Sequence, residues 1–253
     1  MIMEAQSTLE GVRTGLDGTT SVDTMSFEGA LLGQGAVVVW NDIAQEGRDQ
    51  FYAWHDKEHM PERLALPGFR RGRRFARPGH SPEWLTVYEA NDLSVVSSPE
   101  YLAALNAPTP LTVNMLRHFR NTSRAVCTVV HSIGSSTGGH VLAMRLDVSG
   151  ESSDAMCHCL YNEVFPRVIS LTGIVACHLF AADASASFVN TAESSTRTFD
   201  VPSWVLLCEA TNPAAADAAR ALLHDDPALE SLSVAVRADA AVYALEICRL
   251  SVR

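Results

Sequence analysis

Residues 51–64, FYAWHDKEHMPERL, and residues 156–169, MCHCLYNEVFPRVI, decide the fold, because the second stretch repeats the pattern of the first. They belong to longer segments, 35–76 and 140–181, which align without a gap at an offset of 105 positions. The two segments therefore predict the same structural unit, used twice. The identical residues that keep their order along both segments are Asp42 and Asp147, Asp49 and Asp154, Glu58 and Glu163, Pro61 and Pro166, Leu66 and Leu171, Gly68 and Gly173, Phe75 and Phe180, and Ala76 and Ala181.

Two further blocks complete the repeat. Residues 84–90, WLTVYEA, match residues 204–210, WVLLCEA, and residues 125–130 match residues 241–246. Each half predicts strand, helix, strand, strand, helix, strand; in the first half the long helix is expected over 46–66 and the second helix from Ser98 onward. This is the order of a ferredoxin-like unit, whose sheet carries helices on one face only. The predicted fold class is α+β: two ferredoxin-like βαββαβ repeats, fused into a pseudo-dimeric α+β barrel in which each repeat covers the other.

The same pattern divides the chain. Residues 1–34 are polar and rich in Ser, Thr and Gly, and are expected to form a flexible N-terminal arm. Residues 35–134 form the first ferredoxin-like repeat, which carries the site. Residues 139–253 form the second, degenerate repeat, with a polar loop insertion at 183–202.

Composition excludes several classes of function. The chain has 253 residues, with 19 Lys and Arg against 29 Asp and Glu, and the resulting net charge of −10 argues against a nucleic-acid or anionic-membrane binder. There is no apolar run of membrane-spanning length and no secretory signal, and the six cysteines form no disulfide framework. We therefore expect a cytoplasmic protein, a monomer or homodimer, whose partner is a small-molecule substrate.

The second repeat serves as an internal control for the first. Leu160 and Val164 stand where the first half has His55 and His59. Because the second-half residues are apolar and share one helical face, that face should pack on the sheet. Both histidines are then expected to face the sheet, as neighbours four residues apart on one helix.

Other polar residues of the first half also occupy positions that are apolar in the second. Asn41 matches Leu146, and strand alternation places positions 70, 72 and 74 on one face, so that Arg70 and Arg74 match Val175 and Leu179. Burying such groups costs several kcal/mol. The contrast predicts one polar pocket, between the long helix and the sheet of the first half, and none of comparable polarity in the second.

Within this pocket, His59 and His55 are the candidate catalytic residues, as a general acid–base pair. Asn41 and an arginine would stabilise a developing oxyanion. The alternative is that both histidines are inert core residues. Arg71, Arg73 and Arg77 are interpreted as a solvated strand edge. The candidate substrate-binding residues are Asn41, Tyr52, Arg70, Arg74, Phe51 and Trp54.

Metal and cofactor motifs are weak. Residues 55–59, HDKEH, match the H-x-x-E-H zinc signature, but no convincing downstream carboxylate completes a site. Cys157 and Cys159 lie two positions apart on a helix and point in different directions. No glycine-rich phosphate loop follows a strand. We therefore predict no metal ligands and no cofactor.

Several motifs together resemble a known family. Residues 54–75, WHDKEHMPERLALPGFRRGRRF, with 84–90, WLTVYEA, with 98–101, SPEY, and with 106–110, NAPTP, look like the EthD-like branch of the dimeric α+β barrel superfamily. The resemblance covers mainly residues 35–130, with a degenerate copy at 139–250. It implies the barrel fold and a site served by a helix histidine at the position of His59. It also implies activities that include cofactor-independent lyases, isomerases, dehydratases and quinone-forming monooxygenases, along with haem-binding branches.

The leading hypothesis is a cofactor-independent enzyme that acts on a small, largely apolar or aromatic metabolite by histidine acid–base catalysis, in a lyase, dehydratase or isomerase step. The alternatives are a non-catalytic small-molecule-binding protein, and a haem-binding or monooxygenase member of the same superfamily.

Overall fold

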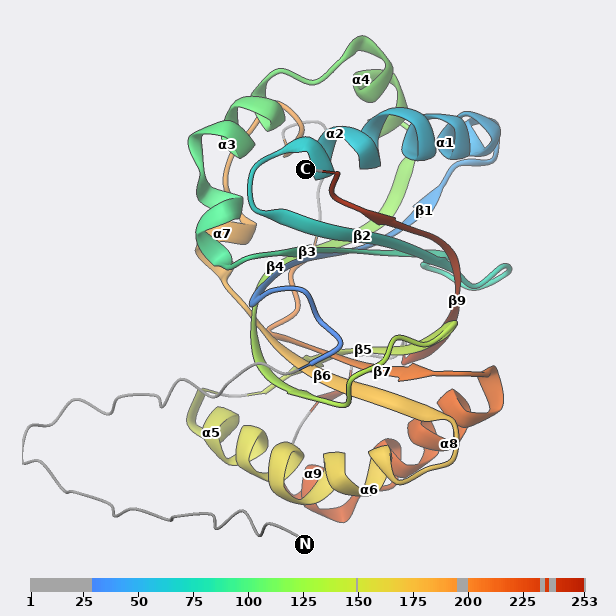
Figure 1. Ribbon diagram of the computed structural model, residues 1–253, viewed down its shortest axis with the longest axis vertical. Coiled ribbons are helices and arrows are strands. Elements are labelled where there is room, and N and C mark those ends of the chain that lie inside the picture. The colour runs from blue at the N-terminus through green and yellow to red at the C-terminus, as the bar shows by residue number, and fades with distance from the viewer. Residues whose placement is uncertain (1–28, 149, 195–199, 233–234, 237–239, 253) are drawn as a thin grey trace, which may run out of the picture.

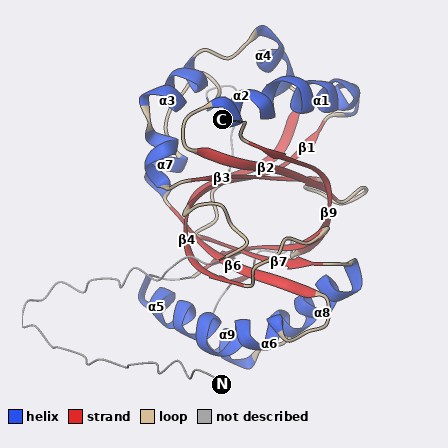
Figure 2. Ribbon diagram, viewed as in Figure 1, coloured by secondary structure: helices blue, strands red, loops and turns tan. Residues whose placement is uncertain are grey.

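The computed structural model describes residues 29–148, 150–194, 200–232, 235–236 and 240–252. Antiparallel strands form a closed barrel, with helices packed on its outside at two opposite ends (Figures 1 and 2). The strand order is β7-β6-β4-β1-β3-β2-β9-β5, and β7 pairs with β5 to close the circle. The predicted α+β class and the pseudo-dimeric barrel are confirmed. No helix among these residues is long and apolar enough to cross a membrane.

The first half builds one side of the barrel, in the strand order β4-β1-β3-β2. Its elements are β1 (Gly35–Ile43), the short turn η1 (Gln45–Gly47), α1 (Arg48–Trp54), η2 (His55–His59), α2 (Met60–Ala65), β2 (Phe69–Ala76), β3 (Trp84–Ala90), η3 (Leu93–Ser97), α3 (Pro99–Asn106), α4 (Pro110–Leu116) and β4 (Phe119–Ile133).

The second half repeats this plan in the order β9-β5-β7-β6, with the two-residue β8 beside β5. Its elements are β5 (His140–Asp147), α5 (Gly150–Cys159), η4 (Leu160–Val164), α6 (Phe165–Ile169), β6 (Ile174–Ala182), α7 (Ala184–Ser187), β7 (Trp204–Ala210), α8 (Pro213–His224), α9 (Pro227–Ser231), β8 (Ala235–Val236) and β9 (Ala241–Leu250). The halves join edge to edge, because β4 pairs with β6 and β2 pairs with β9.

The long helix of each half has the same local irregularity. The expected helix over 46–66 is continuous from Arg48 to Ala65, but its middle turn, η2, is a wider π turn, and η4 is the same feature in the second half. Pro61 and Pro166 each follow that turn by two residues. Proline cannot donate to the carbonyl four residues back and its ring crowds it, so a widened turn accommodates it. Because both halves share it, the π turn belongs to the fold and is not in itself a mark of a site.

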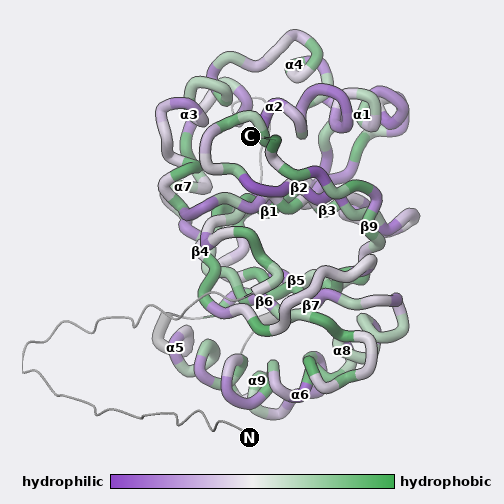
Figure 3. The backbone as a smooth tube through the Cα atoms, in the orientation of Figure 1, coloured by the Kyte–Doolittle hydropathy of each residue, from purple (hydrophilic) through white to green (hydrophobic). Residues whose placement is uncertain are grey.

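The barrel interior contains buried charges, which corrects the interpretation of Arg71 and Arg73 as a solvated edge. Arg71 Nε donates to Glu89 at 2.8 Å, and Arg73 donates from Nη1 to Glu209 at 2.6 Å. Both arginines are buried, as are Glu89, Glu209 and His178 beside them. Burial by itself raises the pKa of Glu209, but the hydrogen bond to His178 and the charge of Arg73 outweigh it and lower that pKa to about 2. The hydrophilic stretch along β2 (Figure 3) is therefore partly internal.

Two segments expected to be loose pack against the barrel where they are described. Of the predicted arm, residues 1–28 lie outside the described residues, but Ala30 and Leu31 are buried, and the carbonyl of Ala30 accepts a hydrogen bond from Arg71. In the predicted insertion at 183–202, α7 packs against β4, where Asp183 N donates to the carbonyl of Val126. Residues 195–199 of the insertion lie outside the described residues.

Candidate functional site

A cavity lies between the long helix, the outer face of the first-half sheet, and α4. Measured out to its open mouth it occupies about 370 Å³. Its walls are mostly aromatic and aliphatic, with a few polar groups, which is the usual character of a small-molecule site. The lining residues are Val39, Asn41, Phe51, Trp54, His55, His59, Thr86, Tyr88, Leu116 and Phe119.

The matching space in the second half is filled. Every polar residue of the first-half cavity has an apolar or thiol counterpart there, and the counterparts pack in one buried cluster. Asn41, His55, His59, Thr86 and Tyr88 are replaced by Leu146, Leu160, Val164, Leu206 and Cys208. The halves share a backbone plan and differ in whether this space is left open and polar.

His55 is fully engaged by its neighbours. Its ring is buried, with Nδ1 2.9 Å from Arg74 Nη1 and Nε2 3.3 Å from the Tyr88 hydroxyl. Burial, followed by the charge of Arg74, lowers the pKa of His55 from 6.5 to about 3. The ring is therefore neutral near pH 7. A guanidinium can only donate, so Nδ1 accepts, and the proton on Nε2 is directed at the Tyr88 oxygen through a long hydrogen bond.

Arg74 is held away from the cavity. It is 2% exposed and donates to Asp56 at 2.5 Å and to Glu246 at 2.8 Å, in addition to His55. Glu246 lies on β9 of the second half and also accepts a hydrogen bond from Tyr52 at 3.0 Å. Arg74 thus links the long helix to β9 of the other repeat, and its hydrogen bond to Nδ1 places the proton of neutral His55 on Nε2.

His59 is the histidine that faces open space. It is half-buried, lines the cavity, and stacks on Trp54 with ring centroids 4.3 Å apart. Trp54 is fixed in turn by a hydrogen bond from its indole to Thr112 at 2.9 Å. The rings of His55 and His59 lie 5.9 Å apart, so the two are neighbours. This geometry places His59, and not His55, where a ligand could exchange a proton with it.

Two hydrogen-bond donors are directed toward the cavity. Asn41 is 2% exposed, and its Nδ2 has no hydrogen-bond partner in the described part of the chain. Tyr88 accepts from His55, so its own hydroxyl proton is available elsewhere, and burial raises the pKa of Tyr88 and keeps the phenol neutral. Sequence reasoning missed Tyr88 and Thr86. The same comparison of halves would have found them, because they match Cys208 and Leu206 in the WLTVYEA block.

The structure brings together five of the candidate site residues around the cavity and places three elsewhere. Tyr52 and Arg74 lie behind the wall, bound to Glu246. The register of β2 against β3 shifts between Phe69 and Arg71, so strict alternation does not extend to Arg70, which is half-buried outside the cavity lining. The five residues that line the cavity are Asn41, Phe51, Trp54, His55 and His59.

The described residues of the cavity do not form a metal site. The described residues contain no group of three His, Cys, Asp or Glu side chains arranged to hold a metal ion. Both nitrogens of His55 are occupied, and one of them faces a guanidinium.

Comparison with known proteins identifies the fold. The sequence matches no protein-family model and no curated protein sequence. An anthrone oxidase-like protein of known structure is similar over 88% of this chain and 95% of its own, with a TM-score of 0.60 and 10% sequence identity. A mutant chlorite dismutase from Candidatus Nitrospira defluvii, solved with cyanide, is similar over 84% of this chain and 90% of its own, with a TM-score of 0.54 and 9% identity.

Proposed function

We propose that this chain is an enzyme that acts on a small, largely apolar or aromatic metabolite in the first-half cavity, with His59 transferring the proton. The observation that carries the proposal is the contrast between the halves. The fold is fully satisfied by Leu146, Leu160 and Val164 in the second repeat, so the polar groups of the first repeat are not needed for folding. Buried polar groups that the fold does not require are most simply explained by chemistry.

The proposed roles follow from the contacts. His59 abstracts a proton from a carbon next to a carbonyl and returns it to another atom, which is the common step of lyase, dehydratase and isomerase reactions. The negative charge moves to the carbonyl oxygen, where Asn41 Nδ2 and the Tyr88 hydroxyl can donate to it. Such donors contribute about 3–4 kcal/mol each to transition-state stabilisation. His55 is a positioning residue, because it is neutral and orients Tyr88.

The proposal needs no bound cofactor, since both the base and the oxyanion donors belong to the chain. The aromatic walls of Phe51, Trp54 and Phe119 support an aromatic substrate. The motif of residues 54–75 and the histidine at position 59 support assignment to the EthD-like branch. The rival proposal is a non-catalytic binding protein that uses the same cavity, and only turnover separates the two.

The decisive experiment is a screen of small aromatic and apolar carbonyl compounds for turnover by the purified chain, followed by His59→Val, which copies Val164. We expect turnover to fall by roughly 10²- to 10⁴-fold, with an unchanged melting transition. His224→Val is the matched control, because His224 is exposed and distant from the cavity lining. Full turnover by folded His59→Val would refute the role of His59, and a chain that binds but converts none of the compounds would favour the rival.

A further inference from the structure

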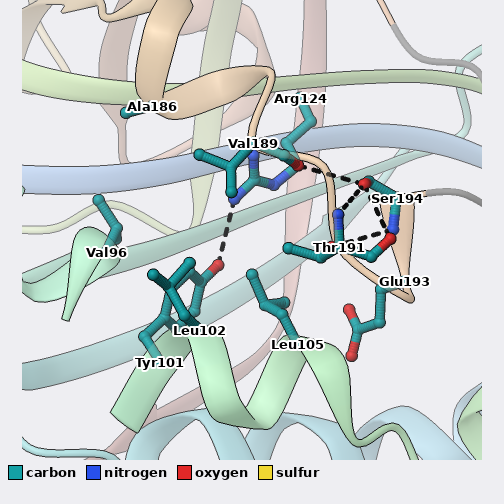
Figure 4. A pocket seen from close by; sticks show the side chains of 10 residues that line it. All are labelled: Val96, Tyr101, Leu102, Leu105, Arg124, Ala186, Val189, Thr191, Glu193 and Ser194. Atoms are coloured by element: carbon teal, nitrogen blue, oxygen red, sulfur yellow. Dashed lines mark hydrogen bonds between the residues drawn. The ribbon is translucent and has the colours of Figure 1, made fainter. Parts of the chain in front are cut away.

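A second cavity adjoins the first and shares His59, Tyr88 and Val39 with it. It occupies about 390 Å³ out to its mouth and is bordered by Arg63 and Glu193. A third space of similar size continues from it past Tyr101 and Leu105 (Figure 4). The proposed site is thus one end of a longer tract along the outer face of the first-half sheet.

The second cavity is assembled from both repeats. Arg63 comes from α2 and Arg124 from β4, whereas Glu193 comes from the insertion of the second half. Arg63 Nη2 donates to Glu193 Oε1, and the backbone N–H of Glu193 donates to the carbonyl of Leu105 at 3.2 Å. The insertion, which the second repeat does not need for its own sheet, therefore completes a wall of the first-half tract.

Positive charge exceeds negative charge among the groups that line this cavity. Arg63 is 4% exposed, and its Nη1 has no hydrogen-bond partner among the described residues. Arg124 donates to two neutral acceptors, the carbonyl of Ser187 at 3.1 Å and the hydroxyl of Tyr101 at 3.2 Å. Glu193 is the one carboxylate in the lining. The lining therefore holds two guanidinium groups and one carboxylate.

Comparison with the second repeat also indicates that Arg63 has a role other than folding. Arg63 occupies the position of Val168, which is fully buried in the apolar cluster of the second half. The fold therefore accepts an aliphatic side chain here. Burying an arginine with an unused donor costs more folding free energy than burying a valine. Arginine is also the residue best suited to hold a planar carboxylate.

We propose that this second cavity binds a carboxylate of the substrate. The substrate is then an aromatic or apolar acid, with its reacting carbon between Asn41 and His59 and its carboxylate at Arg63 and Arg124. The proposal deepens the proposed function and rests on it only for which end of the molecule reacts. The carboxylate site itself is defined by the charges and by the vacant donor.

The test uses a homologous set of probes: benzoate, phenylacetate, 3-phenylpropionate and 4-phenylbutyrate, each paired with its primary amide. Binding is measured by titration calorimetry and by intrinsic tryptophan fluorescence, to which Trp54 in the cavity wall contributes. We expect at least one acid to bind roughly tenfold or more tightly than its amide, since a hydrogen bond to a charged group is worth about 1.5–3 kcal/mol. Acids that bind no better than their amides, or a complete lack of binding across the set, would overturn the proposal.

The variants remove charge without leaving one residue of an ion pair charged and unpaired. Arg63→Val combined with Glu193→Gln takes away both members of the buried pair and should weaken acid binding severalfold, while leaving the amide within about twofold of wild type. The acid preference that remains belongs to Arg124. Arg48→Met with Glu83→Gln removes a partly exposed pair that lines neither cavity, and should change neither affinity. If the first double variant fails to fold, Arg124→Met keeps the buried pair and should weaken acid binding severalfold.

An acid preference that is undiminished in Arg63→Val/Glu193→Gln, or in Arg124→Met where that variant is used, would overturn the carboxylate site. The readout is binding, so its failure is distinct from failure of the proposed function. An acid preference that depends on Arg63, together with full turnover in His59→Val, would retain the carboxylate site and refute the role of His59.

Discussion

Replacing Asn41 with the residue of the other repeat should make the protein more stable and less active. Asn41 is 2% exposed, and its Nδ2 has no hydrogen-bond partner in the described part of the chain. Leu146, its counterpart, lies in the buried cluster of the second half. Asparagine and leucine are of similar size, so Asn41→Leu removes a buried donor without creating a large cavity or overfilling the space.

The magnitude follows from the cost of leaving a buried polar group without a partner. That cost is about 1–3 kcal/mol, and Asn41→Leu should raise the free energy of unfolding by a similar amount. For a chain of this length, each kcal/mol shifts Tm by roughly 2–4 °C, so Tm should rise by roughly 2–12 °C. If Asn41 stabilises an oxyanion, turnover should fall at the same time by roughly 10²-fold.

The assay is chemical and thermal unfolding of the ligand-free protein, with turnover measured on the same preparations. Leu146→Asn is the reciprocal control. It removes a buried leucine and adds a buried amide, so it should lower the free energy of unfolding by roughly 3–5 kcal/mol. A stability of Asn41→Leu at or below that of wild type would refute the reasoning, because it would show that an ordered water or a change of rotamer satisfies the amide.

Three further predictions concern the same cavity. Tyr88→Phe keeps the ring packed on Phe69 and removes the hydroxyl, so steady-state kinetics should show turnover lowered by roughly 10²-fold with little change in KM; unchanged turnover would exclude Tyr88 as a donor. The pKa of a histidine is near 6.5 in the unfolded chain, whereas the pKa of folded His55 is about 3. The free energy of unfolding therefore falls as the pH drops below 6.5, and His55 accounts for about 2 kcal/mol of this fall between pH 6.5 and 5. Denaturant titrations should show this loss in wild type and not in His55→Leu. Purified protein should lack stoichiometric zinc, because the described residues place no third ligand beside the two histidines; stoichiometric zinc in elemental analysis, with activity lost on chelation, would contradict this.

The helices and strands could be predicted because the residues that specify their ends lie next to them in the sequence. Ser98 and Pro99 predict a helix start, and the side chain of Ser98 does accept a hydrogen bond from the N–H of Tyr101. Gly68 and Gly173 lie in the turns that follow the long helices, with φ near +90°, a conformation that suits glycine. The repeat then supplied the topology, because two matching units with one-sided sheets have few ways to cover each other.

Part of the site could be predicted for a different reason. The repeat allowed each polar residue to be compared with a neighbour in the same structural position, and this comparison indicated His55, His59 and Asn41. It placed Arg74 correctly on the helix side of β2. It could not show that Asp56 and Glu246 would engage Arg74 fully, because Glu246 comes from β9, far away in the sequence.

The contribution of the insertion could not be read from its sequence. A polar Ser- and Thr-rich stretch predicts a solvated loop, and nothing in its composition specifies a surface on the other repeat. Glu193 is nevertheless 6% exposed, because its carboxylate meets Arg63. A contact between segments so far apart depends on the closed barrel placing β6 beside β4, which is a property of the assembled sheet.

The buried charges at the centre of the barrel, in contrast, were encoded in the repeat. Glu89 and Glu209 are the matching acids of WLTVYEA and WVLLCEA, and in this barrel both reach the same buried arginine in the interior. Two carboxylates brought together in the interior require cations between them. Arg73, which contacts both acids, and His178, which contacts Glu209, are themselves matching positions of β2 and β6. An acid retained in both copies of an inward-facing strand therefore predicts that the basic residues of the neighbouring strand point inward, and this rule assigns Arg73 to the interior from the repeat pattern alone.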